Sequence, residues 1–174
     1  MFYIEDTTII CIDLQEKLVN MLENGQKVAK KCEKLMQTAN ILNVDTIITE
    51  QYPKGLGKTI EEISKIANFE TFEKTSFSAL RSDGFEYDLR KNIIIFGIET
   101  HICVYQTVLD LIEKGHNVYV VSDCCASREK LNHKTALELM KQFGARITTL
   151  EIVLFEFLKS SKHINFKEIQ GLIK

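Results

Sequence analysis

Short apolar runs alternate along the chain with longer segments of helical periodicity. Six runs rich in β-branched residues predict strands at 7–14, 44–50, 69–75, 92–98, 117–123 and 145–150. Apolar residues at helical spacing predict helices at 22–41, 60–67, 80–90, 102–114, 130–143, 151–158 and 166–173. The proline and glycines of 51–59 predict a loop there. The alternation of strands and helices is typical of βαβ units, which form a parallel sheet.

Right-handed crossovers between such units give an open, doubly wound sheet with helices on both faces. We therefore predict a three-layer α/β/α sandwich, Rossmann-like, with six parallel strands in the order 3-2-1-4-5-6. The run NIIIFGI (92–98) is continuously apolar, as expected of a strand buried on both faces. In this order the first and fourth strands are neighbours at the point where the winding reverses. Ligands of such sheets bind there, beyond the carboxyl ends of the strands.

Length and composition narrow the class of protein. The 174 residues predict a single domain spanning 1–174. A net charge of −2, from 22 basic and 24 acidic residues that are well mixed, does not predict a nucleic-acid-binding surface. No apolar run approaches the roughly 20 residues of a membrane span, and the N-terminus does not resemble a secretory signal. Five cysteines, an odd count, then predict free thiols in a reducing cytoplasm.

Three chemically distinct side chains converge on the predicted binding edge. Asp13 lies at the carboxyl end of the first strand, Lys74 at the end of the third, and Cys103 just past the end of the fourth. If Thr100 caps the following helix, Cys103 lies in its first turn, where unpaired N–H groups lower a thiol pKa. Asp13 can then accept the thiol proton while Lys74 orients the carboxylate. These residues predict nucleophilic acyl chemistry by cysteine, with the N–H of Cys103 facing an oxyanion.

The same segments carry a family resemblance over nearly the whole chain. The segments are IDLQ (12–15), TEQYPKGLGKT (49–59), FEKTSFSA (72–79), GIETHICV (97–104), VYVVSDCCASR (118–128) and HINFKEIQGLIK (163–174). Together they resemble the isochorismatase-like cysteine hydrolases, and most closely the branch of isochorismatase-domain-containing proteins. The resemblance implies a catalytic triad of Asp13, Lys74 and Cys103. It also implies a cis peptide between Ile98 and Glu99, which lets the Glu99 N–H join that of Cys103 in an oxyanion hole.

The resemblance also bears on substrate and cofactor. The name-giving isochorismatases cleave a vinyl ether and lack the cysteine, so its presence here favours a small amide, carbamoyl or related acyl substrate. Nicotinamidase relatives bind a metal through an Asp-x-His motif and later histidines. The matching loop here reads TEQYPKG, and the four histidines begin only at His101. We therefore expect neither a metal nor another cofactor. Relatives assemble, which implies a homo-oligomer.

Some residues leave alternatives open. Gln51 and Tyr52 follow the second strand and are candidate pocket residues, as is His101, which lies two positions from Cys103 and so does not face it on a helix. Cys124 and Cys125 are either a redox pair or part of a loop after the fifth strand, which we favour. The alternative to an enzyme is a non-catalytic binding or scaffold protein that retains the fold. Cys11 and Cys32 are expected in the core. The apolar stripe of 166–173 is expected to cover the chain's own core, with a subunit contact as the alternative.

Overall fold

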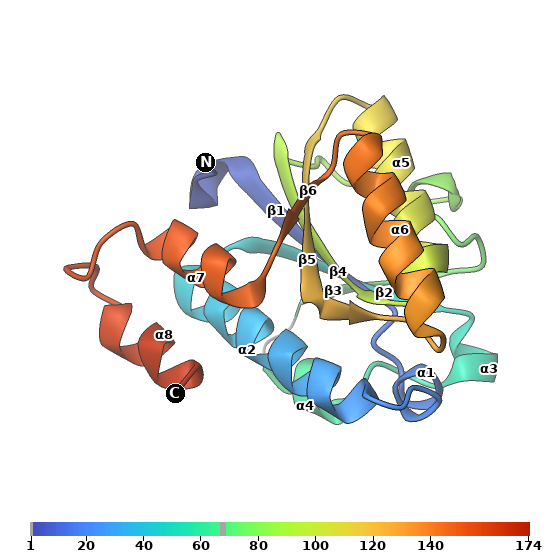
Figure 1. The fold of residues 1–174 in the computed structure, drawn as a ribbon, viewed down its shortest axis with the longest axis horizontal. Helices are drawn as coiled ribbons and strands as arrows, with labels where there is room; N and C mark the ends of the chain where they lie inside the picture. The colour runs from blue at the N-terminus through green and yellow to red at the C-terminus, as the bar shows by residue number, and fades with distance from the viewer. Residues whose placement is uncertain (1, 67–68) are drawn as a thin grey trace.

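The computed structural model describes residues 2–66 and 69–174. Its centre is a parallel six-stranded sheet in the order β3-β2-β1-β4-β5-β6, as predicted (Figure 1). The strands are β1 (Thr7–Ile12), β2 (Asp45–Gln51), β3 (Glu70–Lys74), β4 (Asn92–Ile98), β5 (Asn117–Ala126) and β6 (Arg146–Thr148). Both β1 and β4 are buried along their whole length, because each pairs on both sides and is covered on both faces.

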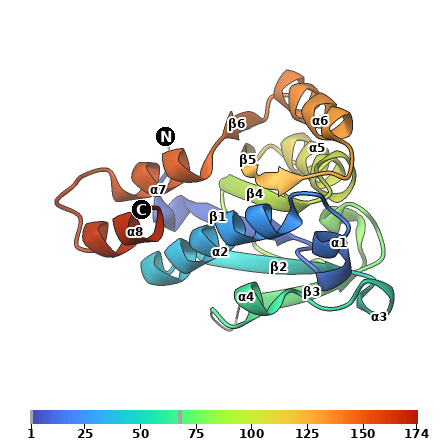
Figure 2. The same cartoon turned by 60° about the horizontal axis from the view of Figure 1, so that its bottom comes forward.

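Helices form a layer on each face of the sheet, which completes the predicted three-layer sandwich. On one face α2 (Gly25–Leu42) lies beside α7 (Leu150–Leu158), and on the other α5 (Tyr105–Glu113) lies beside α6 (Lys130–Gln142) (Figure 2). Short helices occupy the connections: α1 (Glu16–Asn20), α3 (Pro53–Leu56), α4 (Glu61–Ser64) and α8 (Phe166–Leu172). Among the described residues no helix is long and apolar enough to cross a membrane.

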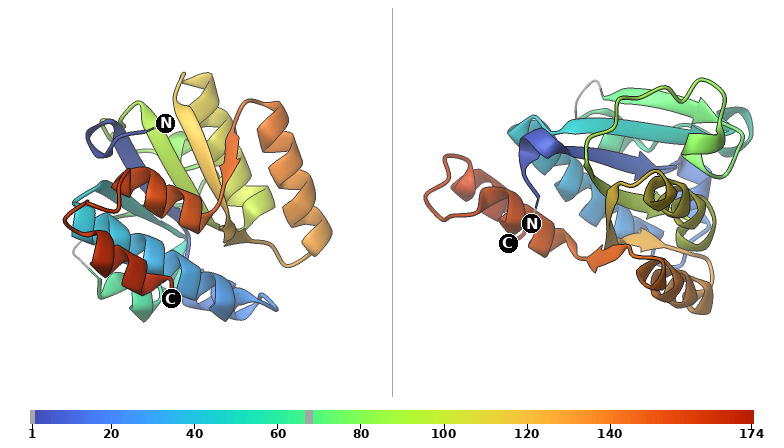
Figure 3. Two further views of the ribbon diagram at one scale, coloured as in Figure 1. Left: turned by 60° about the vertical axis from the view of Figure 1, so that its left-hand side comes forward. Right: turned by 90° about the horizontal axis from the view of Figure 1, so that it is seen from above.

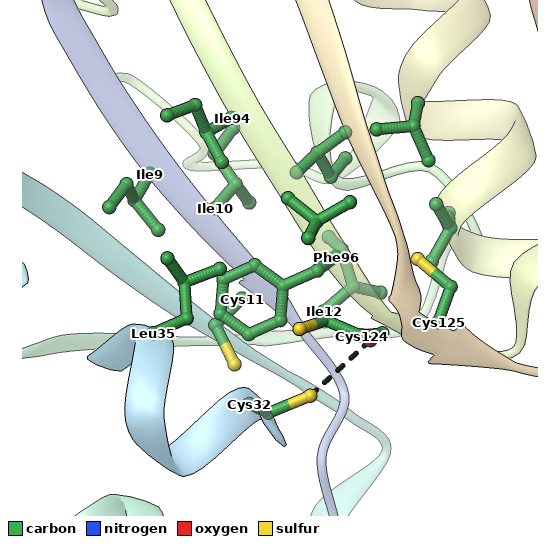
Figure 4. Packing of buried hydrophobic residues seen from close by; sticks show 14 of the residues in the cluster. Ile9, Ile10, Cys11, Ile12, Cys32, Leu35, Ile94, Phe96, Cys124 and Cys125 are labelled. Carbon is green, nitrogen blue, oxygen red and sulfur yellow. Dashed lines mark hydrogen bonds between the residues drawn. The ribbon is translucent and has the colours of Figure 1, made fainter. Parts of the chain in front are cut away.

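The core surrounds the two central strands and includes all five cysteines. Cys11, Cys32 and Cys124 gather beneath β1 and β5 with isoleucines and Phe96 (Figure 4). The Cys32 thiol donates to the backbone oxygen of Cys124 at 3.3 Å. All five cysteines are free and buried. Cys11 and Cys32 are therefore core residues, as expected.

Two predictions about single elements are wrong. The segment 80–90 is not helical beyond a short 3-10 turn at Ala79–Arg81. Its apolar side chains pack instead as an edge-to-face aromatic cluster, in which Phe85 and Tyr87 contact each other and Phe72 of β3. Cys124 and Cys125 do not lie in a loop after the fifth strand, because β5 continues through them and Cys125 pairs with Gly97. Their placement inside a strand does not support the alternative that the two cysteines form a redox pair.

Other boundaries shift by a few residues. The helix predicted at 60–67 is a single turn, α4, and the end of the predicted range at Ala67 lies outside the described residues. The predicted loop 51–59 contains α3, and α1 was not predicted because five residues are too few for a clear apolar period. The C-terminal helix α8 lies alongside α2 (Figure 3) and buries Ile169, so the tail covers the chain's own core as expected.

Candidate active site

The residues of the predicted triad come from three strand ends at the same edge of the sheet. Asp13 directly follows β1, Lys74 is the last residue of β3, and Cys103 lies in a π-helical turn (Thr100–Val104) directly after β4. The π-helical turn replaces the predicted α-helical first turn, and Thr100 is inside it rather than capping it. Turns of this kind recur at functional sites. All three side chains are almost entirely buried, with residue exposures of 0%, 3% and 5%.

Asp13 and Lys74 form an ion pair that no solvent reaches. Lys74 Nζ lies 2.8 Å from Asp13 Oδ2, and neither side chain is exposed. Thr49, on β2 between them, donates through its hydroxyl to Asp13 Oδ1 at 2.7 Å. Asp13 has φ of 49°, a left-handed conformation that is uncommon for residues other than glycine and that often marks functional sites. Both carboxylate oxygens therefore have a donor, and the carboxylate is held in one orientation.

Gln51, the last residue of β2, joins the lysine to the thiol. Its side-chain oxygen accepts from Lys74 Nζ at 2.7 Å, and the thiol of Cys103 points to the same oxygen at 3.9 Å. Strand pairing explains the first contact, because Gln51 and Lys74 are register partners. Gln51 was expected only as a pocket residue, but its contacts make it part of the cluster itself.

Electrostatics at Cys103 differ from the sequence-based expectation. Burial and the negative charge of Asp13 raise the pKa of the thiol to about 12, while the nearby Lys74 ammonium opposes part of that rise. The predicted lowering of this pKa at a helix N-terminus is therefore wrong. Desolvation of the thiolate is the largest cause of the rise because the sulfur is almost fully enclosed. A raised pKa favours the neutral form of the Cys103 thiol.

The segment that follows β3 closes over the ammonium. Backbone oxygens of Ser76 and Phe77 accept from Lys74 Nζ at 3.4 and 3.1 Å. This segment is tied to α5 by Asp110, which accepts from Ser78 Oγ at 2.6 Å and from Arg81 at 2.6 and 2.8 Å. The loop carbonyls are thereby fixed at the distance that a buried ammonium needs for solvation.

The same segment is also linked by hydrogen bonds to the backbone of Cys103. The N–H of Ala79 donates to Thr107 Oγ1 at 3.1 Å, and Thr107 Oγ1 donates to the backbone oxygen of Cys103 at 2.7 Å. The turn that carries the thiol and the loop that covers the lysine are therefore held by one helix, α5.

The structure has a cis peptide bond between Ile98 and Glu99. The Glu99 carboxylate turns away toward Arg128, whose guanidinium Nε donates to it at 3.1 Å and whose backbone N–H donates at 2.8 Å. The carboxylate of Glu99 is thus occupied by Arg128. The part that the backbone N–H groups of Glu99 and Cys103 play toward an oxyanion stays a prediction.

The other two candidate pocket residues, Tyr52 and His101, lie in different places. Tyr52, half exposed and with φ of 37°, lines a cavity of about 340 Å³ whose walls include Lys74 and Ser82. The cavity lies beside the end of β3, and the role of Tyr52 in a substrate pocket stays a prediction. His101 instead bonds through its ring Nδ1 to Ser127 Oγ at 2.9 Å, on the side of β5.

Sequence reasoning missed one buried polar residue. The side-chain amide of Gln15 pairs with both backbone groups of Gln51, accepting from its N–H at 2.7 Å and donating to its carbonyl at 3.0 Å. Its own backbone N–H donates to the carbonyl of Asp13 at 2.7 Å. The signals in the sequence were its position two residues after the predicted acid and its place at the end of the IDLQ segment (12–15). In the described part of the chain no group of three or more His, Cys, Asp or Glu residues is arranged to hold a metal ion.

Comparison with known proteins gives the chain a family. The model of the isochorismatase domain matches residues 7–152. Isochorismatase domain-containing protein 2 of Xenopus laevis is 39% identical over 172 residues, covering 96% of this chain and 83% of that protein. Isochorismatase domain-containing protein 1 of Danio rerio is 36% identical over 172 residues, covering 97% of this chain but only 61% of that protein.

A solved structure agrees in fold over nearly the full length. The MAR1 ribonuclease from Caenorhabditis elegans superposes with a TM-score of 0.94 and 37% identity, covering 99% of this chain and 91% of that one. The match to the isochorismatase domain contains all three strand-end residues, Asp13, Lys74 and Cys103. With these identities over most of its length, the chain belongs to the isochorismatase family of hydrolases.

Proposed function

We propose that this protein hydrolyses a small amide, carbamoyl or related acyl compound, with Cys103 as the nucleophile and Asp13 and Lys74 as its partners. The observation that carries the proposal is the buried cluster in which Lys74 Nζ bonds both Asp13 Oδ2 and Gln51 Oε1, with the Cys103 sulfur 3.9 Å from the same amide oxygen. A buried acid, ammonium and thiol in mutual contact are the elements of cysteine-based acyl transfer.

In the first half-reaction, Asp13 takes the thiol proton as the sulfur attacks the carbonyl carbon. The pKa of the resting thiol, about 12, means that little thiolate exists beforehand, so proton transfer and attack proceed together. The C–S bond forms and the carbonyl oxygen becomes an oxyanion. Asp13 then returns the proton to the leaving nitrogen, the C–N bond breaks, and a thioester remains on Cys103.

The second half-reaction releases the acid. Asp13 takes a proton from a water molecule, whose oxygen attacks the thioester carbonyl, and the C–S bond breaks. The proton passes to the leaving sulfur, which restores the thiol. Lys74 holds the Asp13 carboxylate in position, because its ammonium is itself fixed by bonds to Gln51 and to the backbone oxygen of Phe77.

The decisive test measures two properties of the same proteins: hydrolysis of candidate substrates and the reactivity of the Cys103 thiol. Small amides, carbamoyl compounds and vinyl ethers are screened for hydrolysis by the unsubstituted protein and by Cys103→Ser and Asp13→Asn variants. We expect turnover of an acyl compound that both substitutions abolish. Iodoacetamide labelling of Cys103, followed by peptide mass, is measured across pH for the same proteins.

The direction in which Asp13→Asn should change the rate of Cys103 labelling can be stated in advance. The charge of Asp13 raises the pKa of Cys103, so Asp13→Asn should lower that pKa and speed labelling at neutral pH, even though hydrolysis is lost. A variant with faster labelling and no turnover identifies Asp13 as the proton carrier. Turnover that survives Cys103→Ser would overturn the proposal, and absence of turnover with every compound would favour the binding or scaffold alternative.

RNA is the second candidate substrate, because a relative 37% identical to this chain is described as a ribonuclease. The balance of 22 basic and 24 acidic residues does not favour it, since binding a phosphate backbone requires clustered positive charge. We expect no cleavage of a labelled single-stranded RNA at low salt. Cleavage that disappears with Cys103→Ser would replace the acyl substrate by RNA.

We propose in addition that the protein acts in a reducing compartment, the cytoplasm. Its five cysteines are all free and buried, and buried unpaired thiols are typical of proteins kept away from oxidising conditions.

A further inference from the structure

The side-chain amide of Gln51 has only one orientation that satisfies its neighbours. Its nitrogen donates to the backbone oxygen of Thr75 at 2.7 Å, and its oxygen accepts from the Lys74 ammonium at 2.7 Å. A flipped amide would set its NH₂ group against an ammonium, donor against donor. The oxygen therefore faces both the ammonium and the sulfur of Cys103.

The backbone of Gln51 is fixed as firmly as its side chain. The amide of Gln15, itself fully buried, pairs with both backbone groups of Gln51 and donates in addition to the carbonyl of Gly57 at 2.6 Å. Gln15 is bonded in turn to the backbone of Asp13. One glutamine thus sets the spacing between the strand end that bears the acid and the strand end that bears Gln51.

We propose that Gln51 is a positioning residue for the reaction, whose neutral carbonyl oxygen orients the Lys74 ammonium and the resting Cys103 thiol, and that Gln15 holds it in register with Asp13. This inference rests on the proposed function and adds a fourth residue to its machinery. In the structure the thiol points to Gln51 Oε1 at 3.9 Å, and in the proposed reaction its proton passes to Asp13.

Neutrality of the residue at position 51 is central to this role. The site holds one cation, Lys74, and one anion, Asp13, beside the sulfur, so its charges balance. A carboxylate in place of the Gln51 amide would keep the shape but put a second negative charge next to the sulfur. A like charge at that distance disfavours the thiolate. An orienting role therefore predicts a change in the thiol's titration and not only in stability.

The test is the pH profile of Cys103 alkylation by iodoacetamide in the full-length protein, read by peptide mass. For Gln51→Glu we expect the profile to move to higher pH, so that labelling at a fixed pH below the midpoint is about tenfold slower or more. Gln142→Glu, at an exposed glutamine of α6, adds the same charge far from this edge and should leave the profile unchanged.

The pH profile of Cys103 alkylation tests this inference independently of whether the protein hydrolyses any compound. A profile for folded Gln51→Glu that coincides with that of the unsubstituted protein overturns the inference, even if Cys103-dependent turnover is found. A displaced profile without turnover of any compound supports the geometry and sinks the proposed function instead.

Folding of the variant is checked by its thermal transition. If Gln51→Glu does not fold, Gln51→Asp takes its place, since its shorter side chain adds the charge with less intrusion on Lys74. The displacement should then keep its direction and be smaller. An undisplaced profile for a folded Gln51→Asp protein overturns the inference as well.

Discussion

Lys74 carries its charge where water does not reach, and this gives it a structural role beside the catalytic one proposed for it. A buried ammonium is tolerated only when its hydrogens and its charge are both matched. Asp13 supplies the opposite charge, while Gln51 and the carbonyls of the loop after β3 supply acceptors. Loss of either charged partner leaves the other buried and unpaired.

We therefore expect Lys74→Met to destabilise the protein by about 3–5 kcal/mol, the usual cost of breaking a buried ion pair from one side. The measurement is urea unfolding followed by circular dichroism. Lys162→Met, at an exposed lysine, is the matched control and should stay within about 0.5 kcal/mol of the unsubstituted protein. Equal losses for the two variants would mean that the Asp13–Lys74 pair contributes nothing specific.

At the scale of elements, β4, the strand that leads to Cys103, packs unusually close to its neighbour β1. Gly97 of β4 has φ of 128°, and a Cβ built on it would lie 2.0 Å from the backbone oxygen of Ile12 in β1. On its other side β4 pairs with β5, and the register of that pairing shifts between Ile95 and Gly97. The close approach of β1 and β4 brings the chain ends bearing Asp13 and Cys103 to the same point of the sheet edge.

Gly97→Ala should accordingly be among the most damaging single substitutions, with a loss of more than about 4 kcal/mol or no soluble protein. Gly171→Ala adds the same methyl group to α8, where nothing lies within 4 Å and φ is not positive. We expect that variant to be as stable as the unsubstituted protein or up to about 1 kcal/mol more stable. Thermal and urea unfolding of both proteins test the contrast, and a tolerated Gly97→Ala would contradict the close packing.

The elements also show what the sequence can and cannot reveal. Strand order and the meeting of Asp13, Lys74 and Cys103 at one sheet edge were predictable because each residue lies at or just past a strand end, and parallel strands bring such ends together. The segment 80–90 was not, because its aromatic residues have helical spacing but pack edge to face against β3.

The roles of Gln15 and Gln51 could not be predicted for a different reason. They depend on hydrogen bonds to backbone groups and to a buried ammonium, which no spacing of residue types encodes. The raised pKa of Cys103 was hidden for the same reason, since it follows from how completely the folded chain encloses the sulfur.

At the scale of the whole molecule, one helix presents apolar residues to solvent on a single face. Ile152 and Phe155 of α7 lie three positions apart and so share a face, and they are 57% and 39% exposed. Ile164, in the connection from α7 to α8, is 94% exposed. Apolar residues grouped in this way mark association surfaces more often than isolated ones do.

This face gives the expected homo-oligomer a location that can be tested. Sedimentation equilibrium should give a mass that is a multiple of the 20.0 kDa chain, and Ile152→Lys should lower it toward that of one chain, because a charge on the shared face must be desolvated on association. Leu131→Lys is the control: its leucine, 73% exposed on α6, has charged neighbours in the sequence, and its substitution should leave the mass unchanged. A single-chain mass for the unsubstituted protein would contradict assembly itself, whereas an assembled Ile152→Lys protein would place the contact on another surface.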